Sequence, residues 1–224
     1  MNDRVFFITG ATGATGKAAA RAFAERGASL VLIGTDQSKL DVLARDLNLP
    51  AARFLTLTAD LRNADAVHST AEAVNAKFGR VEGLIHLVGG WAGGKTIAET
   101  PVNDFESMLG QHAWTTFHLF KELSPLLAKN KWGRVIVVSA PTATNPQGKT
   151  SAYTAAKAAQ ENLVLNLAAE LKESNVTANI IQVKSIDVNR EGRGTTPDEI
   201  VASMIYLCSD EANKVTGARI PLFR

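Results

Sequence analysis

The sequence is poor in cysteine, in excess charge of either sign and in long apolar runs. Its 224 residues contain one cysteine, Cys208, so an internal disulfide is impossible. Lysine and arginine total 24 against 22 acidic residues, without a basic run, so the charge gives no reason to expect binding to nucleic acid or to an anionic membrane. No apolar segment is long enough to span a bilayer, and the first expected strand begins too early for a secretory signal. We therefore expect a cytoplasmic protein. We also expect no metal site.

The hydrophobic content, 46%, allows a sizeable core, and we expect a single domain over residues 1–224. Short apolar segments alternate with longer segments of helical periodicity, and several of the short segments are apolar throughout. This βαβα alternation predicts an α/β fold, a doubly wound parallel sheet of about seven strands with helices on both faces, known as the Rossmann fold. The expected strands are residues 4–9, 29–34, 53–58, 83–88, 134–139, 177–183 and 218–222, and the clearest expected helices are 17–26, 38–47, 64–78 and 104–129.

The stretch TGATGATG joins the first expected strand to the first expected helix. Gly10, Gly13 and Gly16 permit a tight turn and let the backbone approach a pyrophosphate at a helix N-terminus. A Walker loop does not fit, because Ala11 stands where its first glycine belongs and Ala18 follows the lysine in place of serine or threonine. A glycine-rich turn without a ligand remains an alternative.

With the motifs that follow, the chain resembles the short-chain dehydrogenase/reductase family over nearly its whole length. Its glycine spacing, TGxxGxxG, is similar to that of the family's extended branch, although the chain is short for an extended member. Asp60 stands where the family contacts the adenine ring, and it could also cap the following helix. The resemblance implies cofactor contacts from Gly10, Thr12, Gly13, Thr15, Gly16, Thr35, Asp60, Leu61, Gly89 and Lys157.

The family's catalytic signature, Tyr-x-x-x-Lys, is present as Tyr153 and Lys157. A spacing of four residues puts both side chains on one helical face, so we expect the ammonium to favour the phenolate of a group whose ordinary pKa is about 10. The resemblance implies that Tyr153 donates a proton to the reduced product and that Lys157 also holds the nicotinamide ribose. An ordinary exposed pair of helix neighbours is the alternative.

Other positions of the family's active site are altered. Ala140 stands where the family has a serine that contacts the substrate, and Ser139 lies one place too early, which on a strand points to the opposite face. His112 aligns with the family's asparagine and is a candidate catalytic residue, although it could simply fill the asparagine's place. The NNAG stretch reads HLVG, Val183-Lys184 replaces Pro-Gly, and the lid segment is reduced to residues 187–196. The cofactor half therefore persists while the carbonyl-reducing half is incomplete.

One branch of the family, the quinonoid dihydropteridine reductases, resembles this altered set more closely. It carries the run GGWAGG found here at residues 89–94, lacks the serine, and has a pair similar to Trp114-Thr115. A quinonoid dihydropterin is already electron-poor, so its reduction has less need of a serine that polarises a carbonyl. Trp91 could stack on the pterin, or it could cover the core. The expected substrate contacts are Trp91, Ala140 and Tyr153.

The residues after the second strand bear on cofactor choice. An acidic residue there would bind the adenosine ribose and repel a 2′-phosphate. Gly34 occupies this acidic position and Thr35 the position where NADPH-preferring relatives often carry arginine, so the sequence favours NADP(H) over NAD(H). The dihydropteridine reductase resemblance points to NADH instead, and a one-residue shift would give Asp36 the acidic role.

Two classes of function remain open. The first is an NAD(P)H-dependent reductase, acting on a pterin-like substrate or on a small carbonyl compound. The second is a non-catalytic dinucleotide-binding sensor or scaffold. The family resemblance also implies a homo-oligomer, a dimer or tetramer, although the apolar spacing of Phe117, Phe120, Leu123 and Leu127 is equally explained by packing on the sheet.

Overall fold

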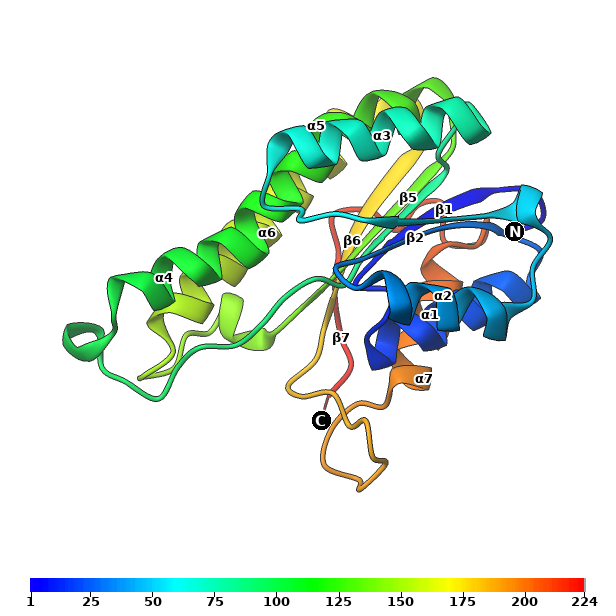
Figure 1. Ribbon diagram of the computed structural model, residues 1–224. Helices are drawn as coiled ribbons and strands as arrows, with labels where there is room; N and C mark the ends of the chain where they lie inside the picture. Colours follow the sequence, from blue (N-terminus) through cyan, green and yellow to red (C-terminus); the bar gives the residue numbers. More distant parts are fainter. Residues whose placement is uncertain (224) are drawn as a thin grey trace.

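The structure, a computed structural model, describes residues 1–223 and contains one parallel sheet (Figure 1). Its strands are β1 Val5–Thr9, β2 Ser29–Gly34, β3 Phe54–Thr58, β4 Gly83–His86, β5 Gly133–Ser139, β6 Val176–Gln182 and β7 Arg219–Pro221. They lie in the order β3-β2-β1-β4-β5-β6-β7, and every pairing is parallel. The order reverses between β1 and β4, so the crevice expected to bind a ligand lies at the carboxyl ends of these two strands.

Helices cover both faces of the sheet (Figure 1). They are α1 Ala14–Glu25, α2 Gln37–Leu47, α3 Ala64–Phe78, α4 Val102–Leu109, α5 Thr115–Lys129, α6 Ser151–Glu170 and α7 Pro197–Leu207. In β1, Val5 and Phe7 join the core beneath α3, α5 and α6, whereas Phe6 and Ile8 join the core beneath α1, α2 and α7. Because adjacent strand residues point to opposite faces, a strand buried on both sides must be apolar at every position. The prediction of a doubly wound parallel sheet is confirmed.

The helix predicted over residues 104–129 is interrupted. Residues 110–114 form a π-helical turn between α4 and α5. The hydroxyl of Thr115 donates to the carbonyl of Gln111 at 2.8 Å, and that of Thr116 donates to the carbonyl of His112 at 2.6 Å. A π-turn inserts one extra residue and widens the helix, which is common at functional sites. Apolar periodicity cannot show this insertion, because the flanking helices keep the same buried face.

Other element ends differ by a few residues from the prediction. The first helix begins at Ala14 and not at residue 17, and the fourth strand ends at His86 and not at residue 88. The backbone N–H of Leu87 donates to the hydroxyl of Thr9, which turns the chain away from the sheet after His86. Within residues 1–223, no helix combines the length and the hydropathy needed to cross a bilayer. The single-domain assignment of residues 1–224 stays a prediction, and Arg224 lies outside the described residues.

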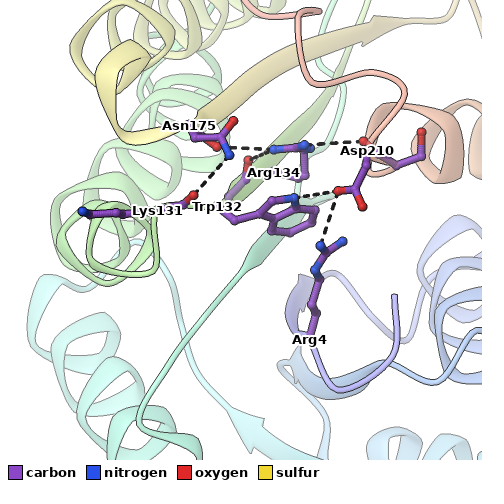
Figure 2. Close-up of polar contacts among 8 residues, drawn as sticks. Arg4, Lys131, Trp132, Arg134, Asn175 and Asp210 are labelled. Atoms are coloured by element: carbon purple, nitrogen blue, oxygen red, sulfur yellow. Dashed lines mark hydrogen bonds and ion pairs between the residues drawn. The ribbon is translucent and has the colours of Figure 1, made fainter.

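A cluster of polar and aromatic side chains surrounds Trp132, the residue before β5 (Figure 2). The guanidinium carbons of Arg4 and Arg134 lie 3.6 Å and 4.2 Å from the indole centroid. The indole N–H donates to Asp210 at 2.9 Å, and Arg4 pairs with the same carboxylate at 3.3 Å. Arg134 is 1% exposed and donates to the carbonyls of neighbouring backbone. The ring therefore joins the first residues of the chain, β5 and the segment after α7.

We expect Trp132→Leu to lower the free energy of unfolding by about 2–4 kcal/mol, because it removes a packed aromatic ring and two cation–π contacts together. Urea unfolding measures the change. Trp91→Leu is the matched control, since Trp91 is 65% exposed and its truncation should cost less than about 1 kcal/mol. Equal losses in the two variants would contradict the structural role of the cluster.

Candidate functional site

The glycine loop between β1 and α1 is shaped by close backbone approach. Gly10 has φ +62°, and a Cβ on Gly16 would lie 2.2 Å from the carbonyl oxygen of Gly10. Gly13 caps α1 with extended backbone and supplies no side-chain cap, and no acidic residue lies in the first turn. The first N–H groups of the helix are therefore free of competing side chains, as anion binding at a helix N-terminus requires.

Two cavities meet at this loop. The larger, about 760 Å³, and the smaller, about 460 Å³, share Gly10, Gly13 and Gly89 among their lining residues. Thr15, in the first turn of α1, also lines the smaller cavity, and its buried hydroxyl has no hydrogen-bond partner among residues 1–223. Two cavities joined at a glycine-rich turn fit the shape of a dinucleotide, which has an adenosine half and a nicotinamide half.

The larger cavity is lined by Gly10, Thr12, Gly13, Thr35, Asp60, Leu61 and Gly89, which belong to the set expected to bind the cofactor. Asp60 does not cap α3, because that role belongs to Asn63, whose side-chain oxygen accepts from two backbone N–H groups of the first turn. The carboxylate of Asp60 instead accepts from the guanidinium of Arg62 at 2.9 and 2.7 Å. The pKa of Asp60 is lowered mainly by these hydrogen bonds.

Asp36 has a local role at the start of α2. Its carboxylate accepts from the backbone N–H of Lys39 at 3.2 Å and from the hydroxyl of Ser38 at 2.6 Å. Gly34 and Thr35 line the larger cavity, whereas Asp36 is not among its lining residues. The alternative in which Asp36 takes the acidic position stays a prediction.

Tyr153 and Lys157 line the smaller cavity from α6. The ammonium nitrogen of Lys157 lies 6.0 Å from the centroid of the Tyr153 ring, so the i,i+4 spacing does bring them together. Lys157 is 5% exposed and donates to the backbone carbonyl oxygen of Val138 and to the side-chain oxygen of Gln160, both at 2.8 Å. Burial lowers the pKa of Lys157 to about 7, with a smaller opposing effect from Glu161.

The phenol of Tyr153 behaves differently from the sequence-based expectation. Its pKa is raised, and the cause is burial, whereas a neighbouring ammonium was expected to lower it. Desolvation disfavours the phenolate and is the dominant effect on this group. Tyr153 is therefore a neutral phenol at physiological pH, the form that can donate a proton.

His112 lies in the π-turn, with its ring against Tyr153 at a centroid distance of 5.5 Å in an edge-to-face arrangement. Its Nε2 is 3.0 Å from the carbonyl oxygen of Gly90, and its buried Nδ1 has no partner in the described chain. Burial, and next the charge of Lys157, lower the pKa of His112 to about 3. The ring is therefore neutral at physiological pH and ties the loop after β4 to the π-turn, and the proton-relay role stays a prediction.

Ser139 and Ala140 differ in their relation to the cavity. Ser139 lines the smaller cavity, and its hydroxyl is buried with no partner among the described residues. Ala140 is buried at the start of a short turn and lines neither cavity. A one-residue offset from the family's serine therefore does not remove position 139 from the cavity, while the substrate contact assigned to Ala140 stays a prediction.

The loop GGWAGG after β4 is compact. A Cβ on Gly89 would lie 2.5 Å from the His112 ring, and one on Gly93 would lie 2.7 Å from the Trp91 ring. Gly94 has φ +90° and donates its N–H to the carbonyl of Lys149 at 2.7 Å. Trp91 lines the smaller cavity with 65% of its surface exposed, so it stands at the rim.

The shortened lid segment is a tied loop. Asp187 accepts hydrogen bonds from the backbone N–H groups of Glu191, Gly192 and Arg193. A bridge between Ile186 and Thr195 closes the base of the loop. These bonds hold the segment in a fixed turn beside the smaller cavity.

Comparison with known proteins identifies the family. A family model described as short chain dehydrogenase matches residues 4–196. This chain belongs to the short chain dehydrogenase family. As a short chain dehydrogenase, it is 25% identical to 7alpha-hydroxysteroid dehydrogenase of Escherichia coli (strain K12), over 97% of this chain and 91% of that one. It is 27% identical to meso-2,3-butanediol dehydrogenase of Serratia marcescens, over 99% and 94% of the two chains.

Solved structures share the short chain dehydrogenase fold. Levodione reductase superposes with a TM-score of 0.91 at 23% identity, covering 99% of this chain and 96% of that one. NAD⁺-bound xylitol dehydrogenase superposes with a TM-score of 0.89 at 21% identity, covering 99% and 98%. The family and its dehydrogenase relatives make this short chain dehydrogenase an oxidoreductase of the NAD(P)-binding type.

Two residues of the site were missed by sequence reasoning. Arg62 is the one cation among the described lining residues of the larger cavity. Gln160 is 0% exposed on α6 and contacts Lys157. Its signal in the sequence was a polar residue three positions after Lys157, on a helix otherwise rich in alanine at its buried positions.

Proposed function

We propose that this short chain dehydrogenase is an NAD(P)H-dependent reductase in which Tyr153, assisted by Lys157, supplies the proton to the product. The observation that carries the proposal is that Tyr153 and Lys157 line one cavity, which begins at the glycine loop. The bound nicotinamide supplies the hydride. The set Gly10, Thr12, Gly13, Thr15, Gly16, Thr35, Asp60, Leu61, Gly89 and Lys157 is the proposed cofactor site.

The protonation states suit reduction. Because burial raises the pKa of Tyr153, the phenol enters the reaction with its proton in place. Proton donation leaves a phenolate, and the ammonium of Lys157, 6.0 Å from the centroid of that ring, stabilises the negative charge. Burial of both groups strengthens this attraction relative to water.

A quinonoid dihydropterin-like compound is the proposed substrate. Trp91 presents a largely exposed ring at the cavity rim, where it can stack on a flat conjugated ring. The likeness to dihydropteridine reductases in the GGWAGG run supports the same choice. NADP(H) is the proposed cofactor, because Gly34 and Thr35 line the larger cavity without a carboxylate and Asp36 is held by its own helix.

One observation favours a second substrate class. Ser139 lines the smaller cavity together with Tyr153, and its buried hydroxyl has no hydrogen-bond partner among the described residues, so it is a candidate donor to a substrate carbonyl oxygen. A small-carbonyl reductase is therefore the alternative.

We also propose a cytoplasmic homo-oligomer. Phe120, Leu123 and Leu127 pack in the core, but Trp114 and Phe117 remain 54% and 45% exposed along the same helical region. Two exposed aromatic rings on one helix suit a contact between copies of the chain.

The test measures the oxidation of NADPH and of NADH in the presence of a quinonoid dihydropterin that is generated in the assay. The loss of reduced-nicotinamide absorbance monitors the reaction. A small diketone is the comparison substrate. Turnover of the pterin with a preference for NADPH is the expected result. Turnover of the diketone alone would replace the pterin proposal with the carbonyl one, and tight cofactor binding without turnover of either would favour a sensor.

A further inference from the structure

Gln160 is a fully buried amide one turn after Lys157 on α6. Its side-chain oxygen accepts from the ammonium of Lys157 at 2.8 Å. Its side-chain nitrogen donates to the hydroxyl of Thr116 at 2.9 Å and to the carbonyl oxygen of His112 at 3.4 Å. A buried amide destabilises the fold unless it is paired, and here the oxygen and both N–H donors of the amide have partners.

The hydrogen bonds of the Gln160 amide extend to the π-turn. The hydroxyl of Thr116 donates to the carbonyl oxygen of His112 at 2.6 Å. This oxygen therefore accepts hydrogen bonds from both Thr116 and Gln160. A continuous chain therefore runs from Lys157 through Gln160 and Thr116 to the turn that carries His112. The widened turn supplies the carbonyl at which the chain ends.

The donors of Lys157 can be counted. An ammonium carries three N–H groups, and two of them are taken by the carbonyl oxygens of Val138 and Gln160. One N–H is left, and Lys157 lines the smaller cavity. Two fixed acceptors at a buried nitrogen restrict the direction of the third bond, which is then available to a ligand.

None of the other charged or titratable groups around Lys157 takes the role of Gln160 as a hydrogen-bond acceptor for the ammonium. Tyr153 and Glu161 lie on the same helix, and Glu161 is bonded to Arg219 at 2.6 Å and to Gln182 at 2.9 Å. Two imidazoles on other elements, those of His112 and His86, feel the charge of Lys157; burial lowers the pKa of each to about 3, so both are neutral. Apart from the carbonyl of Val138, Gln160 is therefore the acceptor that holds the ammonium directly.

We infer that Gln160 is a positioning residue for Lys157, which it holds as a directed ammonium and couples to the π-turn that carries His112. This inference rests on the reductase function proposed above. It adds to the proton-donating pair Tyr153 and Lys157 a third side chain, which lines neither cavity. Gln160 acts through Lys157 and has no contact of its own with the substrate.

The test compares Gln160→Met, which keeps the volume and removes the acceptor, with Gln160→Glu, which adds a carboxylate. The probe is lysine labelled with ¹³C at Cε in the full chain, with the Lys157 signal assigned by its loss in Lys157→Met. We expect the pKa of Lys157 to fall by about one to two units in Gln160→Met, and to rise by about one to three units in Gln160→Glu. Gln182→Met is the matched control, because it deletes a buried amide that bonds Glu161 and not Lys157.

The titration requires no turnover, so it separates failure of this inference from failure of the reductase proposal. Where turnover is present, the alkaline limb of kcat/KM should follow the Lys157 titration, moving to lower pH in Gln160→Met and to higher pH in Gln160→Glu. Thr116→Val, which removes the hydroxyl that accepts from Gln160, should give a smaller fall and keeps the test usable if Gln160→Met does not fold. Shifts of the same sign in Gln160→Met and Gln160→Glu, or shifts no larger than in Gln182→Met, would overturn the inference.

Discussion

Tyr153→Phe should lower kcat by about 10²–10⁴-fold while the dissociation constant of the cofactor stays nearly unchanged. The substitution removes one oxygen atom and keeps the ring that packs at 5.5 Å against His112. The proton source is lost, because the neighbouring imidazole has a pKa of about 3 and is neutral at physiological pH. Lys157 remains to bind the cofactor, so turnover should fall while cofactor affinity is retained.

Steady-state kinetics with NADPH, together with cofactor titration by fluorescence, measures both quantities. Tyr206→Phe is the matched control, since Tyr206 is 55% exposed on α7, away from both cavities. The control should keep wild-type values. An undiminished rate in Tyr153→Phe would remove Tyr153 from the proton-transfer step and would transfer that role to solvent or to another group.

The fold was predictable from the sequence because it depends on the identity of buried residues. Runs such as Val5 to Ile8 can be buried on two sides only in a strand between helices, and this requirement is local. The i,i+4 spacing of Tyr153 and Lys157 likewise fixes their proximity once α6 forms. Element type and one pair of site residues therefore followed from short-range pattern.

The remainder of the site depends on contacts between distant segments. Asp60 and Asn63 both precede α3, and only their geometry shows that Asn63 is the cap while Asp60 pairs with Arg62. The direction of the Tyr153 pKa shift required a balance of burial against charge, which a spacing rule does not contain. The link between Gln160 and His112 joins residues 48 positions apart and depends on a π-turn that is not visible in apolar periodicity.

Gly16→Ala should have the second large effect, on both stability and cofactor binding. A Cβ at Gly16 would lie 2.2 Å from the carbonyl oxygen of Gly10 and 2.7 Å from the Cα of Ala11, and both are backbone atoms that cannot rotate away. Relief of this clash must move the glycine loop, which we expect to lower the free energy of unfolding by about 1–3 kcal/mol. Loss of one charge-assisted hydrogen bond to the pyrophosphate would weaken cofactor binding by about 10–100-fold.

Gly13→Ala tests whether a glycine of the loop is required because a side chain would clash there. The two glycines belong to the same pattern, but a Cβ at Gly13 would meet the Gly10 carbonyl oxygen at 3.4 Å, an ordinary contact, and its φ of −74° suits any residue. Urea unfolding should therefore show a change below about 1 kcal/mol in Gly13→Ala and a larger one in Gly16→Ala. Cofactor titration by calorimetry completes the comparison, since a Cβ at Gly13 can hinder the pyrophosphate without disturbing the fold. If Gly16→Ala were as stable as the wild type and bound cofactor equally well, the result would contradict the claim that glycine is required here for the close approach of α1 to Gly10.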